Sequence, residues 1–375
     1  MSPRRWVLMV AGEASGDLYG AHLARTLREM APEVSFYGIG GVKMEEAGVE
    51  ILYGCEELAV VGITEALSKG LQVWKAYRAL RRSLSERRPS VAVLIDYPGF
   101  NLPLAKALKG AGIPVLYYVS PQVWAWRPGR ARKMAERVDR LAVILPFEVE
   151  FYRSYGVKAH FVGHPLCDLL EGSPAGPVAR ARLGYSEEET VIAILPGSRS
   201  TEVRRLLGPM LEAARILRHS VPQSRFPLAL APTLREDDLP RREPWLEVFE
   251  GRTWEVMAAS DVMMVASGTA TLEGALLGVP MVILYKVNPI SYLLGRMMVN
   301  VRHIGLPNLL AGREVVPELI QGAATPWRIA EEVAALLGKR RRQEVKAALE
   351  EIKGTLKGGA SRRVAEMALE LMGVN

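Results

Sequence analysis

The chain has 375 residues, of which 49% are hydrophobic and 24% are charged. This length is too great for one ordinary core and the composition is that of a folded protein, so we expect two globular domains and exclude a disordered or fibrous chain. The net charge of +7 favours an acidic partner: nucleic acid, an anionic membrane surface or a phosphorylated substrate.

The apolar stretches are short. None reaches the roughly 18 residues that a membrane span requires, and the six apolar residues after Arg5 are fewer than the roughly 7–15 of a signal-peptide core. We therefore expect a cytoplasmic protein whose first apolar run is a strand. Cys55 and Cys167 are too few for a disulfide framework or a zinc site, and no metal or cofactor is expected. No nucleic-acid-binding motif accompanies the basic residues, so nucleic acid is not expected as a partner.

Short apolar runs alternate with helical stretches along the chain, the pattern of parallel sheets built from βαβ units. In the first half the expected strands are 6–10, 35–39, 91–95, 115–119 and 141–144, and the expected helices are 16–30, 63–86, 101–109 and 128–137. A linker rich in Pro and Gly follows at 164–177. The expected strands of the second half are 191–195, 228–231, 246–249, 262–265 and 281–284, and three helices at 326–338, 342–355 and 361–372 close the chain.

This order predicts an α/β protein with two doubly wound, Rossmann-like domains, at 1–168 and 169–340. We expect the segment 341–375 to return to the first domain or to exchange with a partner in a homodimer. Ligands of such sheets bind where strands end, in a cleft that the two domains are expected to share. The turns that follow strands therefore supply the candidate site residues.

Two turns of the second half share one design, an apolar strand followed by small and hydroxyl residues and then a helix. They span 195–202 (LPGSRSTE) and 266–273 (ASGTATLE). A helix N-terminus offers free N–H groups and the positive end of the helix dipole, which suit a phosphate. Ordinary N-capping is the alternative, and the repetition of the design together with one Arg favours an anion. The candidate ligands are Ser198, Arg199, Glu202, Ser267, Gly268, Thr269 and Thr271.

Two turns of the first half carry carboxylates. The segment 11–17 (AGEASGD) opens the first helix but lacks the dinucleotide-binding glycine pattern, which leaves Glu13 to bind a sugar hydroxyl or to cap the helix. Asp96 follows a buried strand, and Pro98 and Gly99 force a turn after it. It is either a catalytic carboxylate or an ordinary turn former.

The loop 118–130 holds two Trp, a Gln and two Arg, a mixture that suits a sugar face or a lipid phosphate better than a core plug. The helix 63–86 places Leu67, Leu71, Trp74 and Tyr77 on one face beside basic residues. Such a stripe is either the buried face of a core helix or a helix lying in a membrane interface.

Six strings together resemble the lipid-A-disaccharide synthase family: 11–17, 118–126 (YVSPQVWAW), 161–165 (FVGHP), 195–199, 266–273 and 306–313 (LPNLLAGR). The resemblance runs in order from about residue 7 to about residue 320. It implies a GT-B glycosyltransferase that joins UDP-2,3-diacylglucosamine to 2,3-diacylglucosamine 1-phosphate (lipid X), releasing UDP and forming a β-1,6-linked disaccharide of lipid A. Gly99 stands where many relatives carry a second Asp, so Asp96 is the one carboxylate of that turn that carries over.

An inverting transfer needs a base for the acceptor hydroxyl and a site for the developing UDP anion. We assign Asp96 as the base, with Glu13 as the second catalytic candidate. Glu273 is expected at the ribose or uracil, Asn308 and Arg313 complete the nucleotide pocket, and the acceptor side comprises Ser15, Gln122, Trp124 and Arg127. Because both substrates carry acyl chains, the enzyme should bind the inner face of the inner membrane peripherally, through the helix 63–86 on an anionic surface.

Two rival functions stay open on the sequence alone. Another UDP-sugar enzyme of the same scaffold, such as a UDP-GlcNAc 2-epimerase or a different glycosyltransferase, would keep the turns of the second half without the apolar and basic helix. A nucleotide-binding protein without catalysis would have no use for Asp96.

Overall fold

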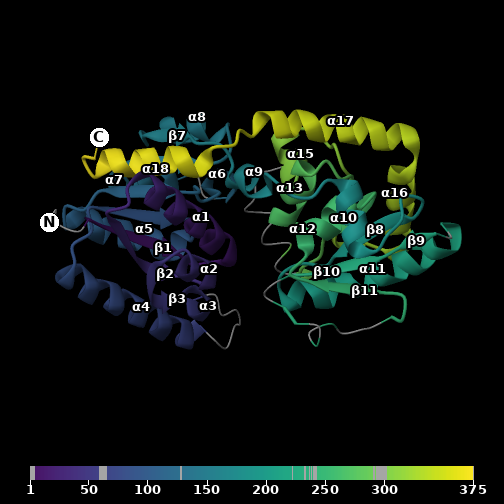
Figure 1. The fold of residues 1–375 in the computed structure, drawn as a ribbon, viewed down its shortest axis with the longest axis horizontal. Helices are drawn as coiled ribbons and strands as arrows, with labels where there is room; N and C mark the ends of the chain where they lie inside the picture. The colour runs from purple at the N-terminus through teal and green to yellow at the C-terminus, as the bar shows by residue number, and fades with distance from the viewer. Residues whose placement is uncertain are drawn as a thin grey trace. The chain divides into compact units, whose positions relative to one another are not determined.

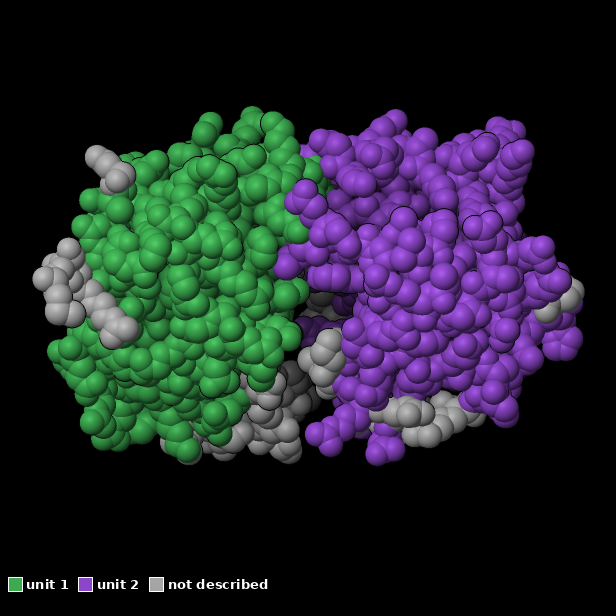
Figure 2. Space-filling model, viewed as in Figure 1, with its two compact units in different colours: residues 1–168, 356–375 green, residues 169–355 purple. Residues whose placement is uncertain are grey.

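The computed structural model describes residues 5–58, 66–126, 129–221, 223–231, 243–289 and 302–374, together with positions 234, 235, 237, 239 and 292. The chain forms two compact units, shown in different colours in Figure 2. Unit 1 contains Met1–Asp168 and Leu356–Asn375, and unit 2 contains Leu169–Thr355. The chain therefore passes from one unit to the other twice.

Unit 1 is built on a parallel sheet of seven strands in the order β3-β2-β1-β4-β5-β6-β7. The strands are β1 (Arg5–Ala11), β2 (Val34–Gly40), β3 (Val49–Gly54), β4 (Val91–Ile95), β5 (Val115–Tyr118), β6 (Arg140–Val143) and β7 (Ala159–Phe161). All five residues of β4 are apolar and buried, as expected for a central strand that is covered on both faces. The chain starts in the middle of the sheet, and its strand order reverses between β1 and β4.

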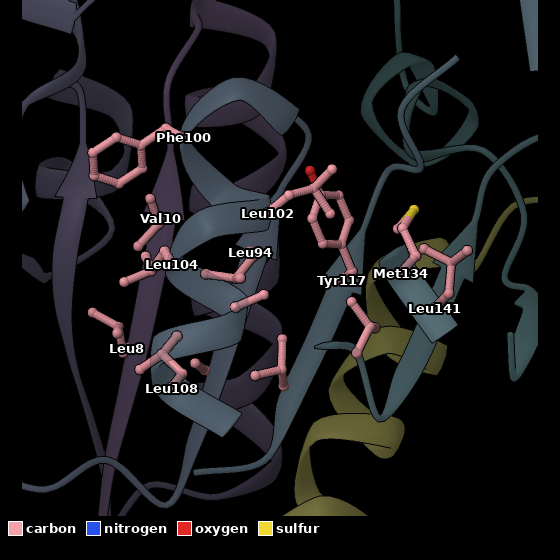
Figure 3. Packing of buried hydrophobic residues seen from close by; sticks show 14 of the residues in the cluster. Leu8, Val10, Leu94, Phe100, Leu102, Leu104, Leu108, Tyr117, Met134 and Leu141 are labelled. Atoms are coloured by element: carbon pink, nitrogen blue, oxygen red, sulfur yellow. The ribbon is translucent and has the colours of Figure 1, made fainter. Parts of the chain in front are cut away.

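Helices cover the sheet of unit 1 (Figure 1). They are α1 (Ala14–Met30), α2 (Val42–Glu46), α3 (Cys55–Leu58), α4 (Ala66–Glu86), α5 (Pro98–Gly110), α6 (Val123–Trp126), α7 (Arg130–Arg137), α8 (Glu148–Arg153) and α18 (Ala360–Leu371). Figure 3 shows Leu104 and Leu108 of α5 among Leu8, Val10 and Leu94 of the central strands. This apolar layer fixes α5, and with it the turn that joins β4 to α5.

Unit 2 repeats the plan with a parallel sheet in the order β11-β10-β8-β12-β13-β14, and β9 pairs with β8. Its strands are β8 (Thr190–Leu195), β9 (Ser224–Arg225), β10 (Pro227–Leu230), β11 (Glu247–Glu250), β12 (Val262–Ala266), β13 (Met281–Tyr285) and β14 (Glu318–Ile320). Its helices include α10 (Gly176–Leu183), α11 (Ser200–Ser220), α12 (Thr253–Ala259), α13 (Thr269–Leu276), α15 (Leu306–Ala311), α16 (Pro326–Leu337) and α17 (Lys339–Thr355). Here the strand order reverses between β8 and β12.

The predicted α/β class with two Rossmann-like domains is confirmed, and each predicted strand has its counterpart. The segment 164–177 is not a plain linker: α9 (Pro165–Leu170) occupies its first half, and α10 starts at Gly176. The predicted start of the helix at Ile63 lies outside the described residues, and α4 is described from Ala66.

The three closing helices divide between the units. The second domain was expected to end at residue 340, whereas unit 2 continues to Thr355 because α17 packs on α13, α15 and α16. Helix α18 packs on α1 in unit 1. Asp168 accepts hydrogen bonds from the backbone N–H groups of Gly359 and Ser361, which caps the start of α18, and Ser361 is hydrogen-bonded to His22 of α1 at 2.7 Å.

Candidate functional site

Each unit carries the predicted site residues at the point where its strand order reverses, which is where doubly wound sheets bind ligands. In unit 1, β1 and β4 pair in parallel with Ala11 opposite Ile95, so Glu13 and Asp96 follow neighbouring strand ends. In unit 2, β8 and β12 pair with Leu195 opposite Val265, so the two hydroxyl-rich turns are neighbours as well. The sequence identified the four turns individually, and the structure shows that they form two neighbouring pairs.

Asp96 is half-buried, and its carboxyl group is poorly hydrated. Burial and, to a smaller extent, the negative charge of Glu13 raise its pKa from the usual 3.8 to about 7, against a hydrogen bond from the Tyr97 backbone that lowers it. A carboxyl group of this pKa exchanges protons near neutral pH, as a general base must.

Backbone strain gathers around Asp96. Asp96, Tyr97 and Val119 have φ angles of 46°, 47° and 62°, a left-handed conformation that is costly for side chains with a Cβ and most of all for a β-branched Val. Each costs on the order of 1–3 kcal/mol and persists only where the surroundings enforce it. The Asp96 carbonyl accepts hydrogen bonds from the Asn101 amide at 2.8 Å and from the Tyr117 hydroxyl at 2.5 Å, which fix this turn.

A cavity of about 230 Å³ opens beside Asp96 in unit 1. Its walls include Asp96, Val119, Ser120, Gln122, Arg130 and Glu148. Gln122 is exposed there. Trp124 is half-buried, donates its indole N–H to Glu148 at 3.0 Å and packs edge-on against Phe147. It therefore supports Glu148 beside the cavity and does not offer a free ring face to a sugar. Arg127 lies outside the described residues.

Glu148 belongs to this cavity and was not predicted from the sequence. It begins α8, where a Glu after the apolar Leu145-Pro146-Phe147 reads as an ordinary first-turn acid. In the structure the residue is 1% exposed, and burial raises its pKa to about 7 in spite of hydrogen bonds from Ser120, Trp124 and the Leu145 backbone. The sequence signal was weak, because Glu148 comes five residues after β6 ends at Val143, whereas Asp96 follows β4 directly.

The other candidates of the first turn separate into two roles. Glu13 is exposed, occupies the N-cap position of α1 and makes no side-chain capping bond, so its carboxylate faces solvent near Asp96. Ser15 is half-buried in the first turn of α1. Asp17 is buried and accepts hydrogen bonds from the backbone N–H groups of Gly41, Lys43 and Met44, which makes it the cap of α2.

In the turn after β8, Arg199 is exposed and Ser198 lies beside it. Glu202 reaches back over the turn: it accepts a hydrogen bond from the Ser198 backbone N–H at 3.1 Å and pairs with Arg199 at 3.2 Å. The Glu202 carboxylate therefore occupies the Ser198 N–H and the Arg199 guanidinium, the two donors that an incoming anion would use. Glu202, a predicted ligand, is therefore part of the internal bonding of this turn.

In the turn after β12, Gly268 and Thr269 are exposed at the N-terminus of α13. The Ser267 hydroxyl donates to the Ile304 carbonyl at 3.2 Å. Thr271 is fully buried and its hydroxyl donates to the Gly268 carbonyl at 2.7 Å, so it bonds to the backbone of its own turn; it is not an N-cap, because the N-cap position of α13 is Gly268. Glu273 is half-buried with its pKa raised by burial, and it accepts a hydrogen bond from the Trp254 indole at 3.1 Å.

Asn308 and Arg313 were expected in the nucleotide pocket. Asn308 is fully buried, and its amide oxygen accepts from the Val315 and Val316 backbone while its amide nitrogen donates to Val316 and Glu318. Its hydrogen-bonding groups are used inside the fold, so Asn308 supports this region of unit 2. Arg313 is exposed and forms a 3.5 Å ion pair with Glu351 of α17.

Across the described parts of the chain, no helix is both long and apolar enough to cross a membrane. Among the same residues, no group of three His, Cys, Asp or Glu side chains is placed to hold a metal ion. His160 lies in β7, and His164 is buried with its pKa lowered to about 3 by desolvation.

The chain is similar to known proteins over nearly its whole length. The family model described as Lipid-A-disaccharide synthetase matches residues 7–371. A lipid-A-disaccharide synthase of Syntrophus aciditrophicus is 48% identical over 98% of this chain and 97% of its own length. Among solved structures, the calicheamicin glycosyltransferase has a TM-score of 0.62 at 14% identity, with 99% of this chain and 98% of its own covered.

The UDP-GlcNAc 2-epimerase of Neisseria meningitidis, solved with UDP-GlcNAc, shares the fold at a TM-score of 0.67 and 15% identity, over 97% of this chain and all of its own. Such low identities show the shared GT-B architecture alone, whereas the family match covers nearly the whole chain. The chain therefore belongs to the lipid-A-disaccharide synthetase family and is a glycosyltransferase of lipid A biosynthesis.

Proposed function

We propose that the chain transfers the diacylglucosaminyl group of UDP-2,3-diacylglucosamine to 2,3-diacylglucosamine 1-phosphate. The acceptor hydroxyl oxygen attacks the anomeric carbon from the face opposite UDP, its proton passes to Asp96, and the bond to the diphosphate breaks with its electron pair leaving on UDP. The observation that carries the proposal is Asp96 itself, whose carboxyl group has a pKa of about 7, stands on a strained backbone and lines a cavity at the switch point of unit 1.

The UDP side of the reaction is assigned to unit 2. Arg199 and the exposed N-termini of α11 and α13, with Ser198, Ser267, Gly268 and Thr269, are the groups that meet the diphosphate. Positive charge and free N–H groups there stabilise the charge that develops on the leaving UDP. Glu202 must release Arg199 and the Ser198 N–H when the diphosphate binds. Glu273 and Arg313 are assigned to the nucleoside, while Thr271 and Asn308 act as supports.

The acceptor side is assigned to unit 1. The cavity beside Asp96 offers hydrogen-bonding groups from Ser120 and Gln122 and the positive charge of Arg130, which suits a phosphorylated sugar. Glu13 and Ser15, at the neighbouring strand end, complete this face. Trp124 contributes indirectly, because its indole N–H donates to Glu148, which lines the cavity.

Membrane association is assigned to α4. Trp74 is 55% exposed on this helix, with the Arg78 guanidinium 5.3 Å from its ring centre. Lys75, Arg81 and Arg82 are exposed on the same helix. An exposed Trp among cations is typical of a helix that lies in an anionic interface, and both lipid substrates stay in such an interface. Tyr77 belongs to the core instead, because it packs on Phe100 and donates to its carbonyl.

The experiment is incubation of the purified protein with UDP-2,3-diacylglucosamine and radiolabelled 2,3-diacylglucosamine 1-phosphate, followed by thin-layer separation and measurement of released UDP. We expect one labelled disaccharide, with one UDP released for each molecule formed and a β configuration by NMR. UDP-GlcNAc supplied alone should remain unchanged. Conversion of UDP-GlcNAc with no disaccharide formed would instead assign the chain the epimerase chemistry of its structural neighbour.

A further inference from the structure

The carboxylate of Glu148 joins two loops of unit 1. Its oxygen Oε1 accepts hydrogen bonds from the Ser120 hydroxyl at 2.5 Å and the Trp124 indole at 3.0 Å, both in the segment after β5. Its oxygen Oε2 accepts from the Leu145 backbone N–H at 3.1 Å, in the turn after β6. One side chain thus fixes the ends of two neighbouring strands to each other.

Other contacts of α8 act on the same segment. The Tyr152 hydroxyl donates to the Pro121 carbonyl at 2.6 Å, and Phe147 packs edge-on against the Trp124 ring with 5.0 Å between ring centres. Residues 119–123 line the cavity beside Asp96, and so does Glu148. The wall of this cavity is therefore held by α8, with the Glu148 carboxylate at the centre of the contacts.

Ordinary helix capping does not account for Glu148. A first-turn Glu that caps its own helix needs only backbone donors close in sequence, and Leu145 already provides one. Ser120 and Trp124 lie 28 and 24 residues away, on a different strand end. In the described part of the structure no basic side chain pairs with Glu148, and burying a carboxylate in this way is costly compared with an apolar side chain of similar volume.

We infer that Glu148 is a positioning residue for the acceptor: by holding Ser120 and Trp124 it shapes the cavity beside Asp96 for the acceptor sugar and presents Gln122 to it. This inference rests on the proposed function. The cavity of about 230 Å³ that these contacts shape is where the acceptor sugar is expected to bind.

Glu148→Gln is the most direct test, because a carboxamide has one acceptor oxygen where the carboxylate has two. If the amide oxygen of Gln keeps the hydrogen bonds from Ser120 and Trp124, its NH₂ group faces the Leu145 N–H, and two donors meet. In the opposite orientation the NH₂ group faces the Trp124 indole N–H, and again two donors meet. Glu150→Gln is the matched control, since Glu150 is exposed on the same helix. We expect Glu148→Gln to raise the KM for the acceptor about tenfold or more, the range for losing a hydrogen bond to a charged group. The KM for the donor should stay within about twofold, as should every constant of Glu150→Gln.

A double-mutant cycle tests whether Glu148 acts on the acceptor through Ser120 and Trp124, which lie in the segment after β5. Ser120→Ala with Trp124→Phe removes both donors to Oε1, and we expect it to raise the acceptor KM about as much as Glu148→Gln does. Adding Glu148→Gln to that background should change the acceptor KM by less than about threefold, because coupled partners are not additive.

The results that overturn the inference are distinct from those that overturn the proposed function. Two results would overturn the positioning role. One is an acceptor KM for Glu148→Gln equal to that of Glu150→Gln, and the other is an equal rise of the acceptor KM and the donor KM in Glu148→Gln. If Glu148→Gln fails to fold, an unchanged acceptor KM in Ser120→Ala with Trp124→Phe would overturn it as well. Absence of disaccharide with the wild-type protein would overturn the proposed function itself.

Discussion

The ring of Tyr97 lies directly against the backbone of Gly12, so that a Cβ at position 12 would come within 2.2 Å of the Tyr97 ring carbon Cδ1. Gly12 precedes Glu13 at the end of β1, and Tyr97 follows Asp96 at the end of β4. This contact therefore joins the two carboxylate-bearing turns of unit 1. A side chain at position 12 is excluded because the Tyr97 ring fills its space.

Gly12→Ala should lower both stability and activity, because the added methyl must displace Tyr97 and with it the turn that carries Asp96. Overpacking of this kind typically costs about 1–3 kcal/mol. Thermal unfolding and kcat measure the two effects. Gly99→Ala is the control, since a Cβ at Gly99 would meet nothing within 4 Å. Equal behaviour of the two variants would argue against the contact.

The pH dependence should follow Asp96. Because the base acts as a carboxylate, kcat/KM should rise with pH through the raised pKa of Asp96, about 7. Glu13→Gln removes a negative charge that disfavours ionisation of Asp96, so the pKa should fall and the acidic limb should move to lower pH. Glu33→Gln, an exposed position, is the control. A limb that does not move in Glu13→Gln would show that Glu13 has no part in tuning the base.

Arg199→Ala should weaken UDP binding about 10- to 100-fold while the fold is kept, because hydrogen bonds to charged groups contribute about 1.5–3 kcal/mol and Arg199 is exposed. Calorimetric titration with UDP measures the effect, with Arg205→Ala, exposed on the same helix, as the control. A dissociation constant that matches the wild type would remove Arg199 from the diphosphate site.

Trp74→Ser should move the protein from anionic liposomes into the supernatant in a sedimentation assay and leave the melting temperature nearly unchanged, since Trp74 is exposed. Trp327→Ser is a matched control, because Trp327 is 72% exposed on α16 of unit 2. Loss of liposome binding in both variants would point to general hydrophobic adhesion, and a large fall in melting temperature for Trp74→Ser would make Trp74 a core residue. The side chains of Leu67 and Leu71, predicted on the same stripe, lie outside the described residues.

The strands of the centre of each sheet were predictable because both of their faces are buried. The run 91–95 is apolar throughout and was predicted with the bounds that β4 has. Edge strands were harder: β3 and β14 were missed, since Val49–Gly54 is half-buried with a Glu inside, and Glu318–Ile320 is three residues long. Neither offers the uninterrupted apolar run that marks a central strand.

The candidate site shows the same limit. The positions of Asp96 and Glu13 at strand ends were predictable because both residues follow central strands. The strand order then brings the two turns together. The burial of Thr271 and Asn308 was not predictable, since a hydroxyl or amide after a turn looks the same whether it faces a ligand or its own backbone. Glu148 was missed because its partners Ser120 and Trp124 are distant in sequence and meet it only in the folded sheet.

The proposed reaction depends most on Asp96 as the general base, and Asp96→Asn tests this role directly. Asn keeps the size and the tolerance for the left-handed backbone at φ 46° but cannot accept the proton. Positioned bases contribute about 10²–10⁴ in rate, so kcat for disaccharide formation should fall by that order while the calorimetric dissociation constant for UDP stays the same. If the variant retains more than about a tenth of the wild-type kcat, well above what loss of a base allows, Asp96 is a turn former and the assignment is contradicted.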